Sequence, residues 1–182
     1  MLRKIIALLA ITSLAACSSS DEGEASILSS HEHEISIQKD LAELRQATAR
    51  YHDIELAEAD GFHLGINGLV TGCVAHPTLG AMGYHYFNAD RFNDPTIHEL
   101  EPEALVYHTA DDGSRELGSV EWVVPRPAWE AVHGAGAPPP VVHGHTFLIL
   151  NPVLNWYVAH AWIWQPNPSG ILSDWNPRVT CP

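Results

Sequence analysis

The sequence has little positive charge. Lys and Arg account for 9 of its 182 residues and Asp and Glu for 22, so the formal net charge is −13. No basic patch is present that would neutralise phosphates, which excludes nucleic acid as a partner. No feature of the sequence points to a particular protein partner.

Several catalytic and cofactor-binding motifs are also missing. The sequence has no GxSxG motif, no phosphate-binding glycine loop and no dinucleotide fingerprint. The CxxCH motif of haem attachment and the HExxH zinc motif are absent too. These absences argue against a serine hydrolase and against nucleotide or haem cofactors. What is present is a globular composition, with 46% hydrophobic and 17% charged residues, and 12 histidines, more than Lys and Arg together.

The first 17 residues have the pattern of a bacterial lipoprotein signal. Arg3 and Lys4 precede an apolar stretch, Ile5 to Ala16, that is too short to span a bilayer as a helix. Its length is typical of a signal-peptide core. The stretch ends in Leu14-Ala15-Ala16-Cys17, which resembles a lipobox, whose cysteine becomes the first mature residue and carries the lipid. An ordinary signal peptide that happens to meet a cysteine is the alternative.

The sequence therefore predicts a lipid-anchored protein of the cell envelope. We expect a signal peptide over residues 1–16, an acidic flexible tether over 17–35 and one globular domain over 36–182. Loss of Arg3 and Lys4 would leave 7 Lys and Arg against 22 Asp and Glu, a net charge of −15. Attachment would then depend on the lipid, because anionic headgroups repel such a chain. Ser18 after the cysteine favours the outer membrane, with the domain facing the periplasm.

Two cysteines, Cys73 and Cys181, remain once Cys17 carries lipid. In an oxidising compartment they most simply form a disulfide, which would tie the end of the chain to its middle. In the chain-entropy description such a bond stabilises the fold by about 4–5 kcal/mol. A metal held by the two thiolates is the weaker alternative, because no CxxC spacing occurs.

The apolar pattern predicts an α+β fold. Apolar residues at three- and four-residue spacing from Ile37 to Ile54 predict one long helix, with Ser36 as its cap and Gly61 as its left-handed stop. A short helix is expected over Ala128–His133, and Asp111–Ser114 predicts a hairpin turn. Short apolar or alternating runs predict strands over Ile66–Val70, Met82–Asn88, Ala104–Thr109, Leu117–Val124, Val142–Leu150 and Asn155–Trp164. We expect a mainly antiparallel sheet with the long helix packed on one face.

Two stretches are dense in special residues. One is GCVAHPTLGAMGYHY, from Gly72 to Tyr86, and the other runs from Trp164 to Cys181 and contains NPSG and DWNP. Together with Ala47–Gly61 they resemble a family of exported bacterial proteins of unassigned function, over most of the mature chain. The resemblance implies a shared organisation and supplies no mechanism.

Strand alternation selects the candidate site residues. His160 is the one imidazole on a strand face that carries Trp156 and Val158. If Asn151–Leu154 is a four-residue connection, His145 lies opposite His160. A five-residue connection places Thr146 there instead and turns His145 to the other face.

A metal site is the leading functional hypothesis. His85 and Glu121 lie in the middle of predicted strands, and with His145 and His160 they would supply three imidazoles and a carboxylate, which suits Zn²⁺ or Cu²⁺. The alternative for each histidine is a core residue hydrogen-bonded to backbone or tyrosine. Three functions follow: a metal-binding protein, a metal-dependent enzyme with Glu121 as general base or ligand, and a scaffold lipoprotein with structural histidines.

Three histidines outside the candidate site have other expected roles. We expect His76 to order the loop beside the disulfide. His31 and His33 lie in the tether, where we expect a solvated charge run, with weak metal binding as the alternative.

Overall fold

The computed structural model of the protein describes residues 21–182. The signal peptide predicted over residues 1–16 and the lipidation predicted at Cys17 lie outside these residues. The chain divides into two compact units between Ser36 and Ile37, and the second unit, residues 37–182, contains the sheet. Within residues 21–182 no helix is both long and apolar enough to cross a membrane.

The long helix predicted between Ser36 and Gly61 is divided in the structure. Helix α1 (Asp21–Thr48) passes through Ser36 and includes residues 21–35, for which the sequence predicted a flexible tether. A 3₁₀ turn, η1 (Ala49–His52), follows, and α2 (Ile54–Ala59) is a separate short helix. The prediction of one continuous helix capped by Ser36 is therefore wrong.

Asp53 explains the break. Its backbone is extended, with φ −86° and ψ 108°, and its side chain accepts a hydrogen bond from the backbone N–H of Glu55 as the N-cap of α2. The hydroxyl of Thr48 donates to the carbonyl of Leu44 in the last turn of α1. Gly61, with φ +90°, ends the helical region as predicted.

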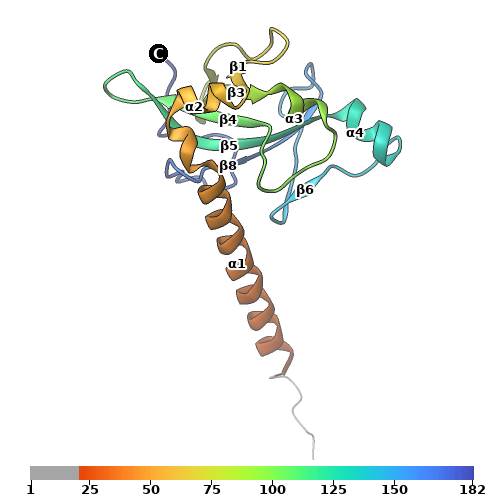
Figure 1. Ribbon diagram of the computed structural model, residues 1–182. Helices are drawn as coiled ribbons and strands as arrows, with labels where there is room; N and C mark the ends of the chain where they lie inside the picture. The colour runs from red at the N-terminus through yellow and green to blue at the C-terminus, as the bar shows by residue number, and fades with distance from the viewer. Residues whose placement is uncertain (1–20) are drawn as a thin grey trace, which may run out of the picture. The chain divides into compact units, whose positions relative to one another are not determined.

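Six strands form one antiparallel sheet, which confirms the α+β class (Figure 1). The order is β1-β3-β4-β5-β8, and β2 also pairs with β3. The strand bounds are β1 (Phe62–Leu64), β2 (Val74–His76), β3 (Gly80–Asn88), β4 (Ala104–Thr109), β5 (Arg115–Pro125) and β8 (Trp156–Ala161). Helix α3 (Ala89–Asn93) follows β3, and α4 (Arg126–His133) follows β5.

Most strand predictions agree with this sheet, and two do not. The residues from Asp111 to Ser114 join β4 to β5 as expected. The segment Ile66–Val70 is a turn, in which Ile66 bridges Leu69. The predicted strand Val142–Leu150 is interrupted at its start, because His143 (φ 49°) and Gly144 (φ 75°) make a tight hairpin turn. The result is a separate two-stranded sheet of β6 (Val141–Val142) and β7 (His145–Thr146).

The two faces of the main sheet carry different side chains. One face packs into the larger core cluster, which includes Leu41 and Leu44 of α1 together with Trp122. The other face carries a smaller cluster with Val123 and Val158. Because side chains alternate along a strand, Glu121 and His160 belong to this second face.

The C-terminal segment is held against β3. Cys73 and Cys181 form the predicted disulfide, with a Cα–Cα distance of 5.7 Å and a sequence separation of 108. Ala81 and Asn176 exchange two backbone hydrogen bonds of 3.1 Å. Gly80 permits this approach, since a Cβ there would lie 2.1 Å from the carbonyl oxygen of Asn176.

Candidate metal centre

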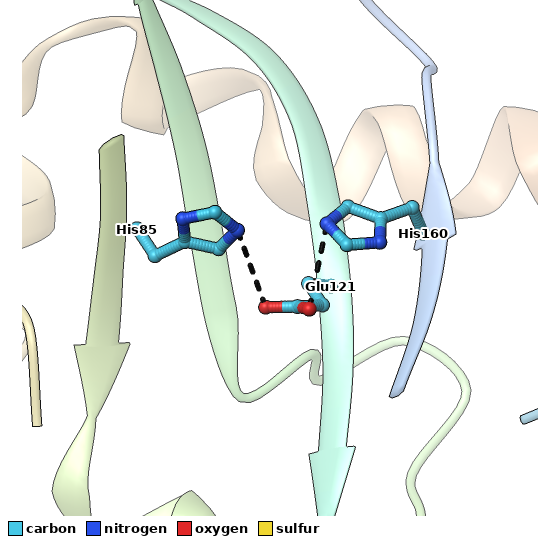
Figure 2. A group of neighbouring side chains, drawn as sticks. All are labelled: His85, Glu121 and His160. Carbon is cyan, nitrogen blue, oxygen red and sulfur yellow. Dashed lines mark ion pairs between the residues drawn. The ribbon is translucent and has the colours of Figure 1, made fainter. Parts of the chain in front are cut away.

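Three buried ionisable side chains from three strands meet on the second face of the sheet (Figure 2). They are His85 of β3, Glu121 of β5 and His160 of β8, which are 2%, 5% and 0% exposed. Glu121 and His160 are directly paired residues of neighbouring strands. His85 pairs with Val106 of β4, so its side chain reaches across β4 to Glu121.

The distances in this group suit a single metal ion. Nε2 of His85 lies 3.6 Å from Oε2 of Glu121, and Nε2 of His160 lies 3.4 Å from Oε1. All three ligand atoms lie within 4.8 Å of one another. Ligands bound at about 2.0–2.2 Å in a tetrahedral site are roughly 3.3–3.5 Å apart. The two contacts with Glu121 are close to that spacing.

A fourth residue, Asp174, supports the group. Its Oδ1 atom lies 3.4 Å from Nδ1 of His160, on the side of the ring away from Glu121. A carboxylate behind a histidine fixes the ring orientation and directs the other nitrogen to a metal. Asp174 was not among the residues predicted from the sequence, although it stands in the distinctive DWNP stretch, because a loop residue has no periodicity that would place it.

Hydrogen bonds on both sides hold the Asp174 backbone in place. The indole N–H of Trp162 donates to the carbonyl of Ser173 at 2.6 Å. The side-chain amide of Asn167 donates to the carbonyl of Trp175 at 3.1 Å. With the Ala81–Asn176 pairing and the disulfide, these contacts fix the segment on which Asp174 lies.

The group is poorly explained as a hydrogen-bonded core. Its contacts of 3.4–3.6 Å are longer than the 2.7–2.9 Å of charge-assisted hydrogen bonds. Both ring nitrogens of His160 and Oδ1 of Asp174 are buried and lack a hydrogen-bond partner among residues 35–182, whose side chains the structure describes. Leaving such an atom unpaired costs about 1–3 kcal/mol. A cation bound between the imidazoles and the carboxylate would give Nε2 of His160 a partner.

Burial sets the protonation states. It lowers the pKa of His85 to about 3, helped by the nearby His160, so His85 is a neutral potential ligand at pH 7. Burial raises the pKa of Glu121 to about 7, against the effect of His160. For His160, burial opposes the charged form, but Glu121 and Asp174 outweigh it and raise the pKa.

A cavity of about 520 Å³ is lined by His85 and Glu121, and His160 is not among its lining residues. Met82 also lines the cavity. Residues three positions apart on a regular strand point to opposite faces, so Met82 and His85 would not be expected to share it. Gly83 allows this, because its φ of +117° interrupts the alternation of β3. A Cβ on Gly83 would lie 2.3 Å from the carbonyl oxygen of Tyr107.

His145 does not belong to the group, so its predicted place opposite His160 is wrong. The bridge between Leu148 and Val158 sets a register in which Thr146 is level with His160. This is the register expected from the five-residue connection. Because the chain turns at His143 and Gly144, His145 instead pairs with Val142 in the small sheet of β6 and β7. Among residues 35–182, whose side chains the structure describes, the candidate metal-binding group therefore contains two histidines and one glutamate.

The remaining histidines have other surroundings. His76 orders its loop as expected, because its Nδ1 accepts the backbone N–H groups of Thr78 and Leu79 at 3.2 Å each. His143 is buried, with Nδ1 3.5 Å from Oδ2 of Asp40. The side chains of His31 and His33 lie outside the described part of the chain.

Comparisons with known proteins add no assignment. No protein-family profile, curated protein or solved structure matches the chain.

Proposed function

We propose that the protein binds a divalent transition metal through His85, Glu121 and His160. Zinc is the first candidate, because two histidines and a glutamate form a known zinc ligand set. Copper(II) is the second, since imidazole and carboxylate ligands also suit it. Asp174 would orient His160 toward the metal.

One observation carries the proposal. Two imidazoles and a carboxylate are buried together from three different strands, with potential ligand atoms within 4.8 Å of one another. Burying a carboxylate is costly unless it is paired or coordinates a metal. The same ligand atoms face one another across a gap that is too long for strong hydrogen bonds.

The cavity favours a metal-dependent enzyme as the second candidate function. Structural zinc sites are closed by four protein ligands, whereas catalytic sites have three and keep one position for water or substrate. The group here offers three ligands, and two of them line a cavity of about 520 Å³. A metal in such a position would activate water or polarise a substrate oxygen.

The envelope location and the lipid anchor are also proposals. The disulfide between Cys73 and Cys181 supports them, because disulfides persist in oxidising compartments such as the periplasm. The lipobox-like sequence before Cys17 supplies the attachment.

Calorimetric titration of chelator-treated protein with zinc chloride and copper chloride tests the metal site. We expect one metal per chain. Replacing a residue that supports a ligand costs 10–100-fold in affinity, so Glu121→Gln and His160→Ala should lose about 100-fold or more.

Two matched variants serve as controls. His145→Ala removes a histidine that lies outside the group, and Glu116→Gln changes a glutamate whose side chain is 60% exposed. Both should bind as the unmodified protein does. Equal affinity in folded His160→Ala and His145→Ala would contradict the proposal.

A further inference from the structure

The cavity above His85 and Glu121 is built mainly from apolar side chains. Aromatic walls come from Phe87, Trp156 and Trp175, and aliphatic walls include Val74, Leu154 and Val158. Its volume of about 520 Å³ lies within the range of small-molecule sites, which are commonly about 300–1,000 Å³.

The polar groups of the cavity are few and lie together. His85 and Glu121 are its ionisable lining residues, and Asn151 is the remaining polar one. Neither Lys nor Arg lines it, so no fixed positive charge would hold an anion. An uncharged ligand is therefore favoured over a carboxylate or phosphate when no metal is bound.

The cavity is held by parts of the chain that are well anchored. His85, Glu121 and Val158 stand on three strands of one sheet. Val74 follows Cys73 of the disulfide, and Trp175 precedes Asn176, which pairs with Ala81. This part of the wall is thus formed before a ligand arrives, which reduces the ordering cost of binding.

We infer that this cavity binds a small, uncharged, largely apolar molecule with one oxygen- or nitrogen-bearing group directed at His85 and Glu121. The apolar body would replace water against the aromatic walls, and the polar group would pair with the two ionisable residues. That the same polar group occupies an open metal position rests on the proposed function.

The neutral fluorescent probe N-phenyl-1-naphthylamine tests the inference on chelator-treated protein. Its fluorescence should rise and shift to shorter wavelength on binding. In competition, 2-naphthol should bind about tenfold more tightly than naphthalene, because its hydroxyl group can pair with His85 or Glu121. The charged 2-naphthoate should be about tenfold weaker than 2-naphthol, because its carboxylate would be buried without a cation.

Two variants narrow the cavity. Leu154→Trp places a large ring at a half-buried lining position, and Ala75→Trp does so at an exposed one. Each should weaken probe binding about tenfold or more while leaving zinc binding unchanged. The control is Val153→Trp, because Val153 is 91% exposed and is not a lining residue.

The outcomes separate the two proposals. Normal probe binding by the unmodified protein without any zinc binding would refute the metal site alone. Unchanged probe binding in both Leu154→Trp and Ala75→Trp would overturn the inference. So would a dimer in light scattering that dissociates as the probe binds, because a second copy of the chain would then be the occupant.

Discussion

Nε2 of His160 lies 3.4 Å from Oε1 of Glu121, and the two residues are direct partners across β5 and β8. Directly opposed residues have Cβ atoms about 4.5–5.5 Å apart, so the sheet register alone brings these side chains together. A slip of one residue would turn one of them to the other face. The candidate site is therefore fixed by strand pairing, with His85 and Asp174 added from β3 and the C-terminal segment.

Asp174→Ala should weaken zinc affinity by about 10–100-fold, because His160 would lose the carboxylate that orients its ring. Calorimetric titration measures the effect, and circular dichroism checks that the fold is retained. The exposed Asp111, changed to alanine, is the control and should bind zinc normally. Equal affinities in the two variants would remove Asp174 from the site.

Metal binding should release protons below about pH 7. Glu121 has a pKa of about 7 and His160 a raised pKa, so both hold protons in mildly acidic solution, which the metal must displace. His85, with a pKa of about 3, contributes none. Affinity should therefore fall as the pH drops through about 7.

Titration in buffers of different ionisation enthalpy measures the released protons directly. We expect about one to two per zinc near pH 6 and fewer near pH 8. A constant number across this range would contradict the protonation states inferred for Glu121 and His160.

The sequence predicted the parts of the site that depend on strand alternation. His85, Glu121 and His160 were each placed in the middle of a strand, and they share one face. The prediction for His145 was wrong because it depended on the length of the connection before β8, which the sequence does not determine. The turn at His143 and Gly144 also interrupts the predicted strand. Asp174 could not be placed, since its contact with His160 depends on long-range hydrogen bonds of the C-terminal segment.

The fold shows the same division between local and non-local information. Strand β4 has the predicted bounds, and the hairpin turn after it was recognisable from Asp111–Ser114. The break in the predicted helix was not recognised, because the apolar spacing continues through Asp53 while its side chain caps a new helix.

Glu103 should make stability depend on pH. This side chain is 1% exposed, and its Oε2 accepts the backbone N–H of Val123 at 2.8 Å. Burial raises its pKa from 4.5 to about 8. Between pH 4.5 and about 8 the folded state holds a proton on Glu103 that the unfolded chain has released. The stabilisation from this protonated side chain is therefore lost as the pH rises toward 8, and the free energy of unfolding falls.

Glu103→Gln keeps the acceptor oxygen and removes the titration. Urea unfolding between about pH 5 and pH 9 should therefore show a smaller loss of unfolding free energy in this variant than in the unmodified protein. Glu101→Gln, at an exposed position nearby, should not change the pH dependence. Identical curves for Glu103→Gln and the unmodified protein would show that Glu103 does not titrate in this range.

Cys17→Ser tests the proposed lipid anchor. In a bacterial host the unmodified protein should lie in the membrane fraction and incorporate labelled palmitate. The variant should lose the label, and it should be released from the membrane or remain unprocessed. Unchanged processing and unchanged membrane retention would contradict lipidation at Cys17.

The most direct measurement is a crystal structure of the zinc-loaded protein with anomalous data at the zinc edge. The metal site proposed here predicts one main peak per chain, about 2.0–2.2 Å from Nε2 of His85, a carboxylate oxygen of Glu121 and Nε2 of His160. Nδ1 of His160 should then lie within hydrogen-bond distance of Asp174. A peak at His31 and His33, or none between Glu121 and the two imidazoles, would contradict the account.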